Sequence, residues 1–433
     1  MMRLVYSLLW YLLLPALLLR LWWRGRREPA YRVRWQERLA LGLGRHACQN
    51  SIWVHAVSVG ETLAAEALIE ALLRQYPDLP VVLTTTSHTA SRQVQQRFAD
   101  RVIHVYCPWD TPDALHRFFN TFQPRLILLM ETELWPNMIA LASLRAVPVM
   151  LVNGRLSART FNGYQRVPAL TAPMLAGVSR LLVQSDVDAR RFLSLGAAAA
   201  AIEITGSIKF DTNLQAVRPV AARIRADWTA RPVWIAASTH RGEDEQVLAA
   251  HHQICQSCPD ALLILVPRHP ERFARMAALV TETGFRMARR SAGERVTAQT
   301  QVYLGDTMGE LLALFGACDV AFVGGSLVPA GGHNLLEPAA WGVPVVTGPH
   351  LENFERIAAL LAEAGALSSV GDAHSLAEVV TGLLGDAALR QRQGAAAAAV
   401  VAANTGALAQ TLAAVSDQLL LSGFSSRTRS SST

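Results

Sequence analysis

The sequence predicts an α/β protein in which two Rossmann-like domains, each built on a parallel sheet, follow an N-terminal membrane-anchoring helix. Short apolar runs alternate with helical segments from residue 52 onward, which is typical of parallel strands covered on both faces. The alternation stops between residues 213 and 232 and then resumes. Residues 4–19 are almost entirely apolar and precede an arginine-rich stretch. We therefore expect an anchor and two domains that face a ligand cleft.

The apolar N-terminus ends in Trp22 and Trp23, and Arg24, Arg26 and Arg27 follow. A cleaved signal peptide would end in small residues instead. Tryptophan suits the headgroup level, and the arginines keep the following chain on the cytoplasmic side. Because a full span needs about 20 apolar residues, we expect an uncleaved anchor that spans the bilayer or lies in its interface. A buried amphipathic helix is the alternative.

Positive charge is concentrated in the first half of the chain. Residues 1–210 carry 23 basic and 14 acidic side chains, a net charge of +9, whereas the remainder carries 17 and 20, a net charge of −3. The first half is thus expected to meet an anionic surface or substrate. No helix-turn-helix, zinc-finger or aromatic RNA-binding signature accompanies the charge, so we predict no nucleic-acid partner. Five cysteines form no evident disulfide framework, which indicates a reducing setting.

The expected elements follow in order along the chain. Strands are predicted at residues 52–57, 81–85, 102–106, 126–130, 147–152 and 180–184, and then at 233–237, 262–266, 302–304, 320–323 and 343–346. Helices are predicted at 62–74, 87–98, 112–119, from 186, and at 334–341 and 394–403. The expected divisions are an anchor with its basic flank (1–30), a first domain (31–212), a linker (213–232), a second domain (233–423) and a disordered tail (424–433).

A glycine-rich loop lies between the apolar runs 320–323 and 343–346. Glycine pairs at residues 324–325 and 331–332 permit a close approach of the backbone to a ligand. The helix that follows would offer N–H groups and a positive dipole end to an anion. Glu337, early in that helix, could accept bonds from ribose hydroxyls. For the glycines alone, a tight turn is the alternative.

Glu61 lies where the first predicted strand gives way to a helix. Gly60 allows a tight turn there. A carboxylate at this place could act as a general base on a hydroxyl. A glutamate that only stabilises the helix N-terminus is the alternative.

Glu131 and Glu133 directly follow another predicted strand. Alternation would send both side chains the same way if the strand continued. One carboxylate could accept a proton or bind substrate while the other is structural. Trp135 belongs either to the core or to a platform for a sugar.

Lys209 is the only lysine among 40 basic residues. It lies just before the predicted linker and hence near the expected cleft. A compact ammonium there could neutralise a phosphate or carboxylate during a transfer reaction. The alternative is that the single lysine is present by chance and has no functional role.

Three segments of the second domain also follow predicted strands or open helices. Arg268 is well placed for a phosphate contact, and His269 either assists it or caps a helix. The loop 305–310 opens a helix whose N–H groups could meet a nucleotide. Residues 238–243 fit either a capped helix start or an anion contact.

Two metal-like patterns are weak. Asp186 and Asp188 spell a pattern found in many metal-dependent glycosyltransferases, but aspartate is also a common helix cap. Cys255 and Cys258 have ligand-like spacing, but the helix around them has a buried face. We predict no bound metal.

Seven segments together resemble the bacterial 3-deoxy-D-manno-octulosonic acid (Kdo) transferase family of lipid A glycosylation. They appear in family order and cover most of the chain. The segments are Arg34-Trp-Gln-Glu-Arg38, His55-Ala-Val-Ser-Val-Gly-Glu61, Met130-Glu-Thr-Glu-Leu-Trp-Pro-Asn137, Val152-Asn-Gly-Arg-Leu-Ser157, Gly206-Ser-Ile-Lys-Phe-Asp211, Pro267-Arg-His-Pro-Glu-Arg-Phe273 and Gly331-Gly-His-Asn-Leu-Leu-Glu-Pro338.

The resemblance implies the two-domain glycosyltransferase fold called GT-B and an inverting transfer of Kdo from CMP-Kdo to a lipid A precursor, lipid IVA, without a cofactor or metal. It implies that Glu61 is the general base and that Glu131 and Lys209 support the transition state. The first domain would bind the acceptor and the second the donor. The residues implied to hold the cytidine nucleotide are Arg268, His269, Met308, Gly309, Glu310, Asn334, Leu335, Leu336 and Glu337. The implied location is the cytoplasmic face of the inner membrane.

Two other functions remain open at this point. A different envelope enzyme of the GT-B class would use another nucleotide sugar, and competition by cytidine or uridine nucleotides would separate the two. A membrane-tethered binding module without catalysis is the other alternative. Acidic residues at several strand ends speak against it.

Overall fold

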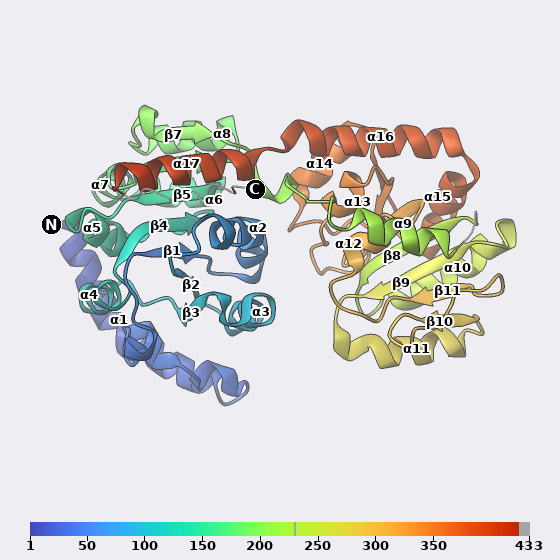
Figure 1. Ribbon diagram of the computed structural model, residues 1–433, viewed down its shortest axis with the longest axis horizontal. Coiled ribbons are helices and arrows are strands. Elements are labelled where there is room, and N and C mark those ends of the chain that lie inside the picture. Colours follow the sequence, from blue (N-terminus) through green and yellow to red (C-terminus); the bar gives the residue numbers. More distant parts are fainter. Residues whose placement is uncertain (229–230, 424–433) are drawn as a thin grey trace, which may run out of the picture. The chain divides into compact units, whose positions relative to one another are not determined.

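The computed structural model describes residues 1–228 and 231–423 and divides into two compact units (Figure 1). The first unit comprises Met1–Asp211 and the chain from Thr405 onward, and the second comprises Thr212–Asn404. Each unit is a parallel sheet with helices, so the predicted α/β class is confirmed. The predicted tail 424–433 and positions 229–230 of the predicted linker lie outside the described residues.

The first unit holds a seven-stranded parallel sheet in the order β3-β2-β1-β4-β5-β6-β7. Its strands are β1 Ser51–His55, β2 Val81–Thr85, β3 Ile103–Tyr106, β4 Pro124–Met130, β5 Val149–Gly154, β6 Arg180–Val183 and β7 Ile202–Ile204. Its α-helices are α1 Met2–Arg24, α2 Val59–Gln75, α3 His88–Phe98, α4 Pro112–Phe122, α5 Pro136–Leu144, α6 Ala158–Gln165, α7 Pro168–Ala176, α8 Asp186–Ser194 and α17 Ala407–Leu421.

The second unit repeats this architecture, with strand order β10-β11-β9-β8-β12-β13-β14. Its strands are β8 Val233–Thr239, β9 Leu262–Pro267, β10 Met287–Arg289, β11 Val302–Leu304, β12 Val320–Val323, β13 Val345–Thr347 and β14 Leu367–Ser369. Its α-helices are α9 Arg218–Ala226, α10 Asp244–Ser257, α11 Phe273–Glu282, α12 Leu311–Phe315, α13 Leu336–Ala340, α14 Glu355–Glu363, α15 Ala373–Gly385 and α16 Ala387–Asn404. Helix α9 therefore occupies much of the stretch expected to be a linker.

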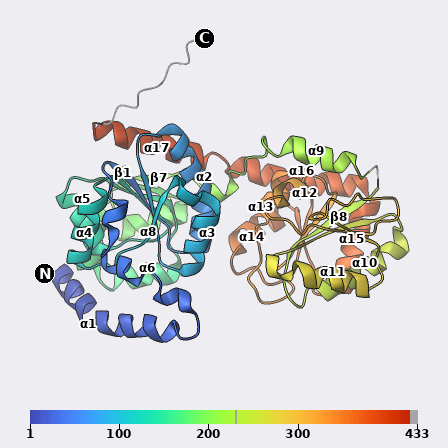
Figure 2. The same cartoon turned by 60° about the horizontal axis from the view of Figure 1, so that its bottom comes forward.

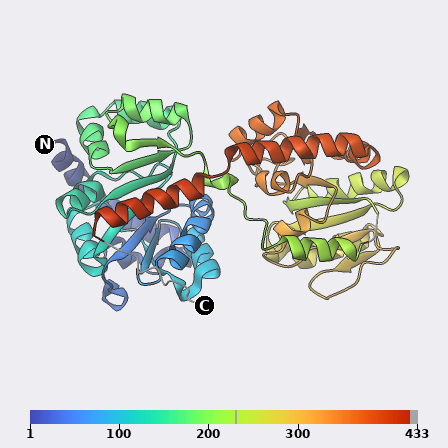
Figure 3. The ribbon, with the colours of Figure 1, turned by 45° about the horizontal axis from the view of Figure 1, so that its top comes forward.

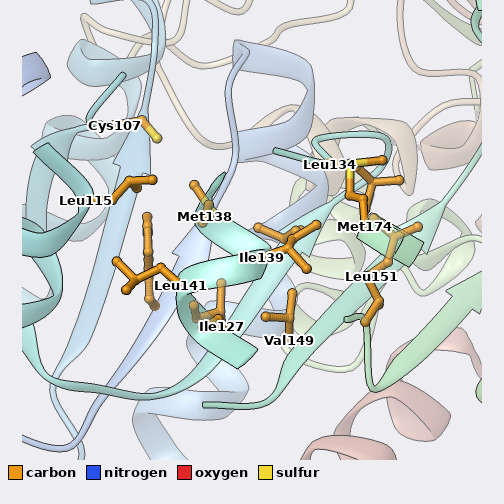
Figure 4. Packing of buried hydrophobic residues seen from close by; sticks show 14 of the residues in the cluster. Cys107, Leu115, Ile127, Leu134, Met138, Ile139, Leu141, Val149, Leu151 and Met174 are labelled. Carbon is orange, nitrogen blue, oxygen red and sulfur yellow. The ribbon is translucent and has the colours of Figure 1, made fainter. Parts of the chain in front are cut away.

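The central strands are buried on both faces, as their continuous apolar runs predict. In the first unit, Met138, Ile139 and Leu141 of α5 pack over Ile127 of β4 and Val149 of β5 (Figure 4). Residues 131–135, which connect β4 to α5, are therefore held at both ends by packed elements. The sequence did not predict β7, β10 and β14, because each is a three-residue edge strand whose side chains are mostly half-buried or exposed.

The C-terminal helix α17 packs on the first unit, although sequence order placed it with the second domain (Figure 3). Asp211 accepts hydrogen bonds from the backbone N–H groups of Gly406 (2.6 Å) and Leu408 (2.7 Å) and so caps this helix. Ala414, Val415 and Leu419 are buried with residues of α2 and β4. The helix covers an apolar face that the first unit would otherwise expose to water.

Candidate active site

Glu61 occupies the first turn of α2, at the carboxyl end of β1. Ser58 is the N-cap, and its hydroxyl accepts from the Glu61 N–H (3.2 Å) while it donates to the Glu61 carboxylate (3.0 Å). The N–H of Val57 donates to the other carboxylate oxygen (2.9 Å). The Ser58 hydroxyl caps the helix, and the Glu61 carboxylate binds back to that hydroxyl and to the residue before it. The glutamate therefore stabilises the helix start, and the same contacts hold its carboxylate in one orientation.

The Glu61 carboxyl is poised to exchange a proton near neutral pH. Its residue is 8% exposed. Burial raises the pKa of Glu61 to about 7, and the negative charges of Glu133 and Glu131 act in the same direction. A general base works best when its pKa lies near the operating pH. Chemically, this carboxylate can take a proton from a hydroxyl.

Glu131 takes a left-handed backbone conformation directly after β4, with φ of 53°. Such a conformation is unusual for a residue other than glycine, and it stores about 1–2 kcal/mol. The strand therefore ends at Met130, and the alternation expected to carry Glu131 and Glu133 the same way does not continue. Glu131 instead forms an ion pair with Lys209, with Nζ 3.1 Å from Oε1.

Asn153 connects this ion pair to the sheet, and the sequence motif alone did not reveal its role. It lies at the end of β5, is 1% exposed and has φ of 55°. Its Oδ1 accepts from the N–H of Ile208 (3.2 Å), the residue before Lys209. The buried amide thereby helps to place the short 3-10 turn Ile208–Phe210, from which the ammonium reaches Glu131.

His55 and Glu133 form a second polar pair, and this pairing was not predicted, although Glu133 was a candidate residue. His55 is fully buried at the end of β1, and its Nδ1 lies 2.8 Å from the Thr84 hydroxyl. Burial lowers the pKa of His55 to about 4, so the ring is neutral at pH 7. Its Nε2 lies 4.0 Å from a Glu133 oxygen that also accepts from the Trp135 indole (3.1 Å). His55 lies on β1, Thr84 lies on β2, and Glu133 follows β4, so sequence spacing did not reveal this group.

In the second unit, the N–H groups of the glycine loop are occupied by the protein's own carboxylate. Glu243, fully buried, accepts from Gly325 (2.7 Å), Ser326 (2.9 Å) and Leu327 (2.8 Å). It also accepts from the N–H of His240 (2.8 Å). A Cβ on Gly324 would lie 2.9 Å from Glu243 Oε2. The glycine at 324 thus permits the approach of Glu243, which occupies the N–H groups of residues 325–327. That the N–H groups of the helix after the loop meet a ligand anion stays a prediction.

The residues expected to hold a nucleotide follow three strands of the second sheet. Arg268 and His269 follow β9, residues 308–310 follow β11, and residues 334–337 follow β12. Since β11, β9, β8 and β12 are adjacent and parallel, these segments leave the same edge of the sheet. Ligands of open α/β sheets bind at that edge.

Residues 334–337 are held by hydrogen bonds within the segment and by burial of two leucines. Asn334 donates to Glu337 (3.1 Å) and accepts from the N–H of Leu336 (3.1 Å). Leu335 and Leu336 are fully buried, so their side chains belong to the core and only their backbone can meet a ligand.

The loop after β11 is held by ion pairs. Glu310 is bound by Arg290 (2.5 Å) and by the Thr307 hydroxyl. The hydrogen bond from Arg290 lowers the pKa of Glu310. Gly309 has φ of 85°, and the Met308 side chain is 65% exposed. The loop is therefore rigid at its carboxylate and presents its methionine to solvent.

Three histidines gather beside Arg268, a cluster that sequence reasoning missed. Nε2 of His240 lies 2.8 Å from Nε2 of His333, and the ring of His269 meets that of His240 edge-on at 5.4 Å. Burial, and then the charge of Arg268, lower the pKa of His333 to about 3. Burial also lowers the pKa of His240. Neutral His240 and His333 rings, with one N–H each, can hydrogen-bond to one another and still offer a group to a polar ligand.

The two metal-like patterns have structural partners. Asp188 accepts from the N–H of Leu156 (2.8 Å) and from Ser185, the N-cap of α8. Cys255 and Cys258 are half-buried against the core of the second unit. His251, one turn before Cys255 on α10, is hydrogen-bonded to Trp234 (3.2 Å) and to the Gln301 carbonyl (3.0 Å). Over residues 1–228 and 231–423, no group of three or more His, Cys, Asp or Glu could hold a metal ion.

Comparison with known proteins assigns the chain to a family. It is 42% identical to 3-deoxy-D-manno-octulosonic acid transferase of Haemophilus influenzae over 418 residues, which is 95% of this chain and 97% of that one. The Kdo transferase of Bordetella pertussis is 38% identical over 433 residues, with 96% and 99% covered. The chain belongs to the Kdo transferase family.

The family models agree with the two units. Residues 33–212 match the model for 3-deoxy-D-manno-octulosonic-acid transferase, and residues 245–400 match the model for glycosyl transferases group 1. The fold is GT-B, and the chain is a glycosyltransferase. A solved UDP-GlcNAc 2-epimerase from Neisseria meningitidis shares the fold with a TM-score of 0.55 and 12% identity, covering 86% of this chain and 100% of that one.

Of the residues predicted for a Kdo transferase site, those of the first unit come together in space. Lys209 touches Glu131, and the charge of Glu131 acts on Glu61. The nucleotide-binding role of the second-unit residues stays a prediction, supported by their common sheet edge.

Replacing Glu243 by glutamine is expected to destabilise the second unit by about 3 kcal/mol. The new amide would turn an N–H donor toward backbone donors and leave buried groups without partners. For a domain of this size, that loss lowers the melting temperature by about 8 °C. Thermal unfolding would be compared with Glu245→Gln, an exposed neighbour on α10. Equal melting temperatures for the two variants would contradict the assigned role of Glu243.

Proposed function

We propose that the chain transfers Kdo from CMP-Kdo to a hydroxyl of a lipid A precursor, with inversion, and that Glu61 is the base. The observation that carries the assignment is a buried carboxyl at a strand end with a pKa of about 7 and two further carboxylates around it. Membership of the Kdo transferase family supports the choice of sugar.

The proposed chemistry needs no cofactor. As the acceptor oxygen attacks the anomeric carbon of Kdo, its proton passes to the Glu61 carboxylate and the bond to the cytidylate phosphate breaks. The cytidine monophosphate leaves with the electron pair. Lys209, held by Glu131, offsets negative charge that develops during the transfer. Residues 308–310 and 334–337, with Arg268 and His269, would hold the nucleotide in the second unit.

A direct test is incubation of the full chain with CMP-Kdo and lipid IVA, followed by mass spectrometry of the lipid. A mass increase corresponding to Kdo supports the proposal and counts the sugars added. Competition should be stronger with cytidine than with uridine monophosphate. Transfer from a uridine-linked sugar, or binding of both substrates without turnover, would contradict it.

The proposed location is the cytoplasmic face of the inner membrane, with α1 lying in the interface. This helix runs along the outside of the first unit (Figure 2). It has 23 residues and a mean hydropathy of 1.9 over its most apolar 18 residues, of which 6% is buried. Leu4, Leu8 and Leu12 are 60–71% exposed along one side. Arg26 and Arg32 lie over the Trp22 ring at 4.3 and 4.9 Å, a pairing suited to headgroups.

A second apolar stretch, Ala387–Leu421, is also long and apolar enough to cross a membrane, and 28% of its most apolar 18 residues are buried. It consists of α16 and α17, and residues of both pack into the two units. We therefore assign membrane contact to α1.

The double substitution Leu8→Ser with Leu12→Ser is expected to weaken binding to vesicles of anionic and zwitterionic phospholipids about 100-fold. Each buried leucine contributes about 1.5 kcal/mol or more to partitioning, and 1.4 kcal/mol is tenfold in affinity. Co-sedimentation measures the effect. Leu193→Ser, on the exposed side of α8, is the control and should bind as the unaltered chain does. Unchanged binding of the double variant would contradict the membrane role of this face.

A further inference from the structure

Helix α1 has a second, inward-facing stripe that contacts the first unit. The residues less exposed than their neighbours recur at helical spacing. They are Tyr6, Ser7, Trp10, Leu14, Leu17, Leu18 and Leu21. The helix makes contacts with α5 and α7. It is therefore seated on the unit by one face while the leucines of the other face remain exposed.

The first contact of this stripe holds the start of α5. Nδ2 of Asn137 donates to the Ser7 hydroxyl (2.9 Å) and to the Asp110 carbonyl (2.7 Å). The Asp110 carboxylate in turn accepts from the N–H groups of Asn137 (2.9 Å) and Met138 (2.8 Å). Burial raises the pKa of Asp110 to about 6, although a hydrogen bond from Tyr6 of α1 acts in the opposite direction. Helix α1 thus contacts the start of α5 through the Asn137 side chain, while Asp110 binds the first N–H groups of α5.

The second contact reaches the acidic site itself. The ring of Trp10 lies 6.1 Å from that of Trp135, centroid to centroid. Trp135 donates its indole N–H to Glu133 (3.1 Å). Glu133 lies 4.0 Å from His55, and its charge raises the pKa of Glu61. One aromatic contact therefore separates α1 from a carboxylate that acts on the base.

We propose that α1 is a positioning element of the transfer reaction as well as an anchor: Trp10 holds Trp135, and Trp135 holds Glu133 beside the base. This inference rests on the proposed role of Glu61. Trp10 touches no reacting atom and acts through Trp135. The lipid-facing and site-facing sides of one helix would in this way link seating at the bilayer to the geometry of catalysis.

Loss of the contact between Trp10 and Trp135 should change the pKa of Glu61 in a predictable direction. When Glu133 is free to move toward solvent, its repulsion of the ionised Glu61 weakens, and the pKa of Glu61 falls. The acid limb of the rate then moves to lower pH, while the mispositioned site lowers kcat. The other charged or titratable groups that surround Glu133 and Glu61 are Glu131, Lys209, His55, Tyr164 and Cys107.

The test is Trp10→Ala in the full chain, assayed with CMP-Kdo and an acceptor whose acyl chains are short enough to stay monomeric in water. Bilayer binding does not enter this assay. We expect kcat to fall about tenfold and the acid limb to move down by about half a pH unit. Trp10→Phe keeps an aromatic ring, so its kcat and the position of its acid limb should lie close to those of the unaltered chain. Leu9→Ala, on the exposed side of α1, should match the unaltered chain.

A second variant keeps the test decisive if Trp10→Ala does not fold. Trp135→Phe retains the ring against Trp10 but removes the N–H that binds Glu133, so it should reproduce the shift of the acid limb with little change in melting temperature. If Trp135→Phe keeps the kcat and pH profile of Leu9→Ala, the positioning role is refuted, whether or not Trp10→Ala folds. Failure of the unaltered chain to transfer Kdo would instead refute the proposed function.

Discussion

Replacing Glu61 by glutamine is expected to lower kcat about 10³-fold while leaving nucleotide binding unchanged. A positioned general base contributes about 10²–10⁴-fold. Glutamine can still accept from the N–H of Val57 and can donate to the Ser58 hydroxyl, but it cannot accept a proton. Single-turnover transfer and cytidine monophosphate titration would measure the two quantities. Glu66→Gln is the matched control, since Glu66 is a half-buried glutamate of the same helix that pairs with Arg97. Full activity of the Glu61 variant would refute the assignment of the base.

The pH dependence of the same reaction follows from the raised pKa. The base must be ionised, so the rate of the unaltered chain should rise with pH through about 7 and level off above it. Stability should change with pH in the opposite direction to the rate. A carboxyl whose pKa is raised by folding destabilises the folded state once the pH exceeds the pKa that the group has in the unfolded chain. The glutamine variant should therefore melt higher than the unaltered chain at pH 8, with the difference vanishing near pH 5. An equal or lower melting temperature at pH 8 would show that burial of Glu61 is not the cause of its shift.

Replacing Lys209 by methionine is expected to lower kcat about 10²-fold. Removing one preorganised positive group from a transfer site typically costs about 10²–10³ in rate. The change also leaves Glu131, in its left-handed conformation, without its cation. Glu131→Gln should cost a similar factor, and the double variant should cost less than the product of the two, because both act through one ion pair.

The comparison with arginine separates charge from shape. Lys209→Arg keeps the charge, but a planar guanidinium does not replace a compact ammonium 3.1 Å from a carboxylate oxygen. We expect it to lose about tenfold in kcat, less than methionine. Arg101→Met breaks an exposed ion pair with Glu70 and should leave the rate unchanged. A methionine variant as active as the Arg101 control would contradict the role of Lys209.

Much of the fold could be predicted because its signals are local. Apolar runs such as residues 126–130 and 320–323 contain enough residues to mark buried strands, and both lie within strands of the structure. The three-residue edge strands carry no such run, and helix α9 lies in a stretch that the pattern left as a linker. The candidate residues Glu61, Glu131 and Lys209 were found because each lies in a motif at a strand end or just before the expected linker.

The partners of these residues could not be predicted, because they come from distant parts of the chain. No spacing relates Lys209 to Glu131, or Asp211 to the helix α17 that it caps. The glycine loop is the clearest example. Its composition indicates close approach by an acceptor, but only the folded chain shows that Glu243 already binds the N–H groups of residues 325–327.

The sequence by itself determined the α/β class, the family and the apolar character of α1, because periodicity, motif order and hydropathy depend only on the order of the residues. Only the tertiary structure decided which carboxylate is buried near Glu61, which cation meets Glu131, and that α1 presents one face to the acidic site. The physical reason is that pKa values and ion pairs depend on burial and distance. Both are set when strands far apart in the sequence are brought to one edge of a sheet.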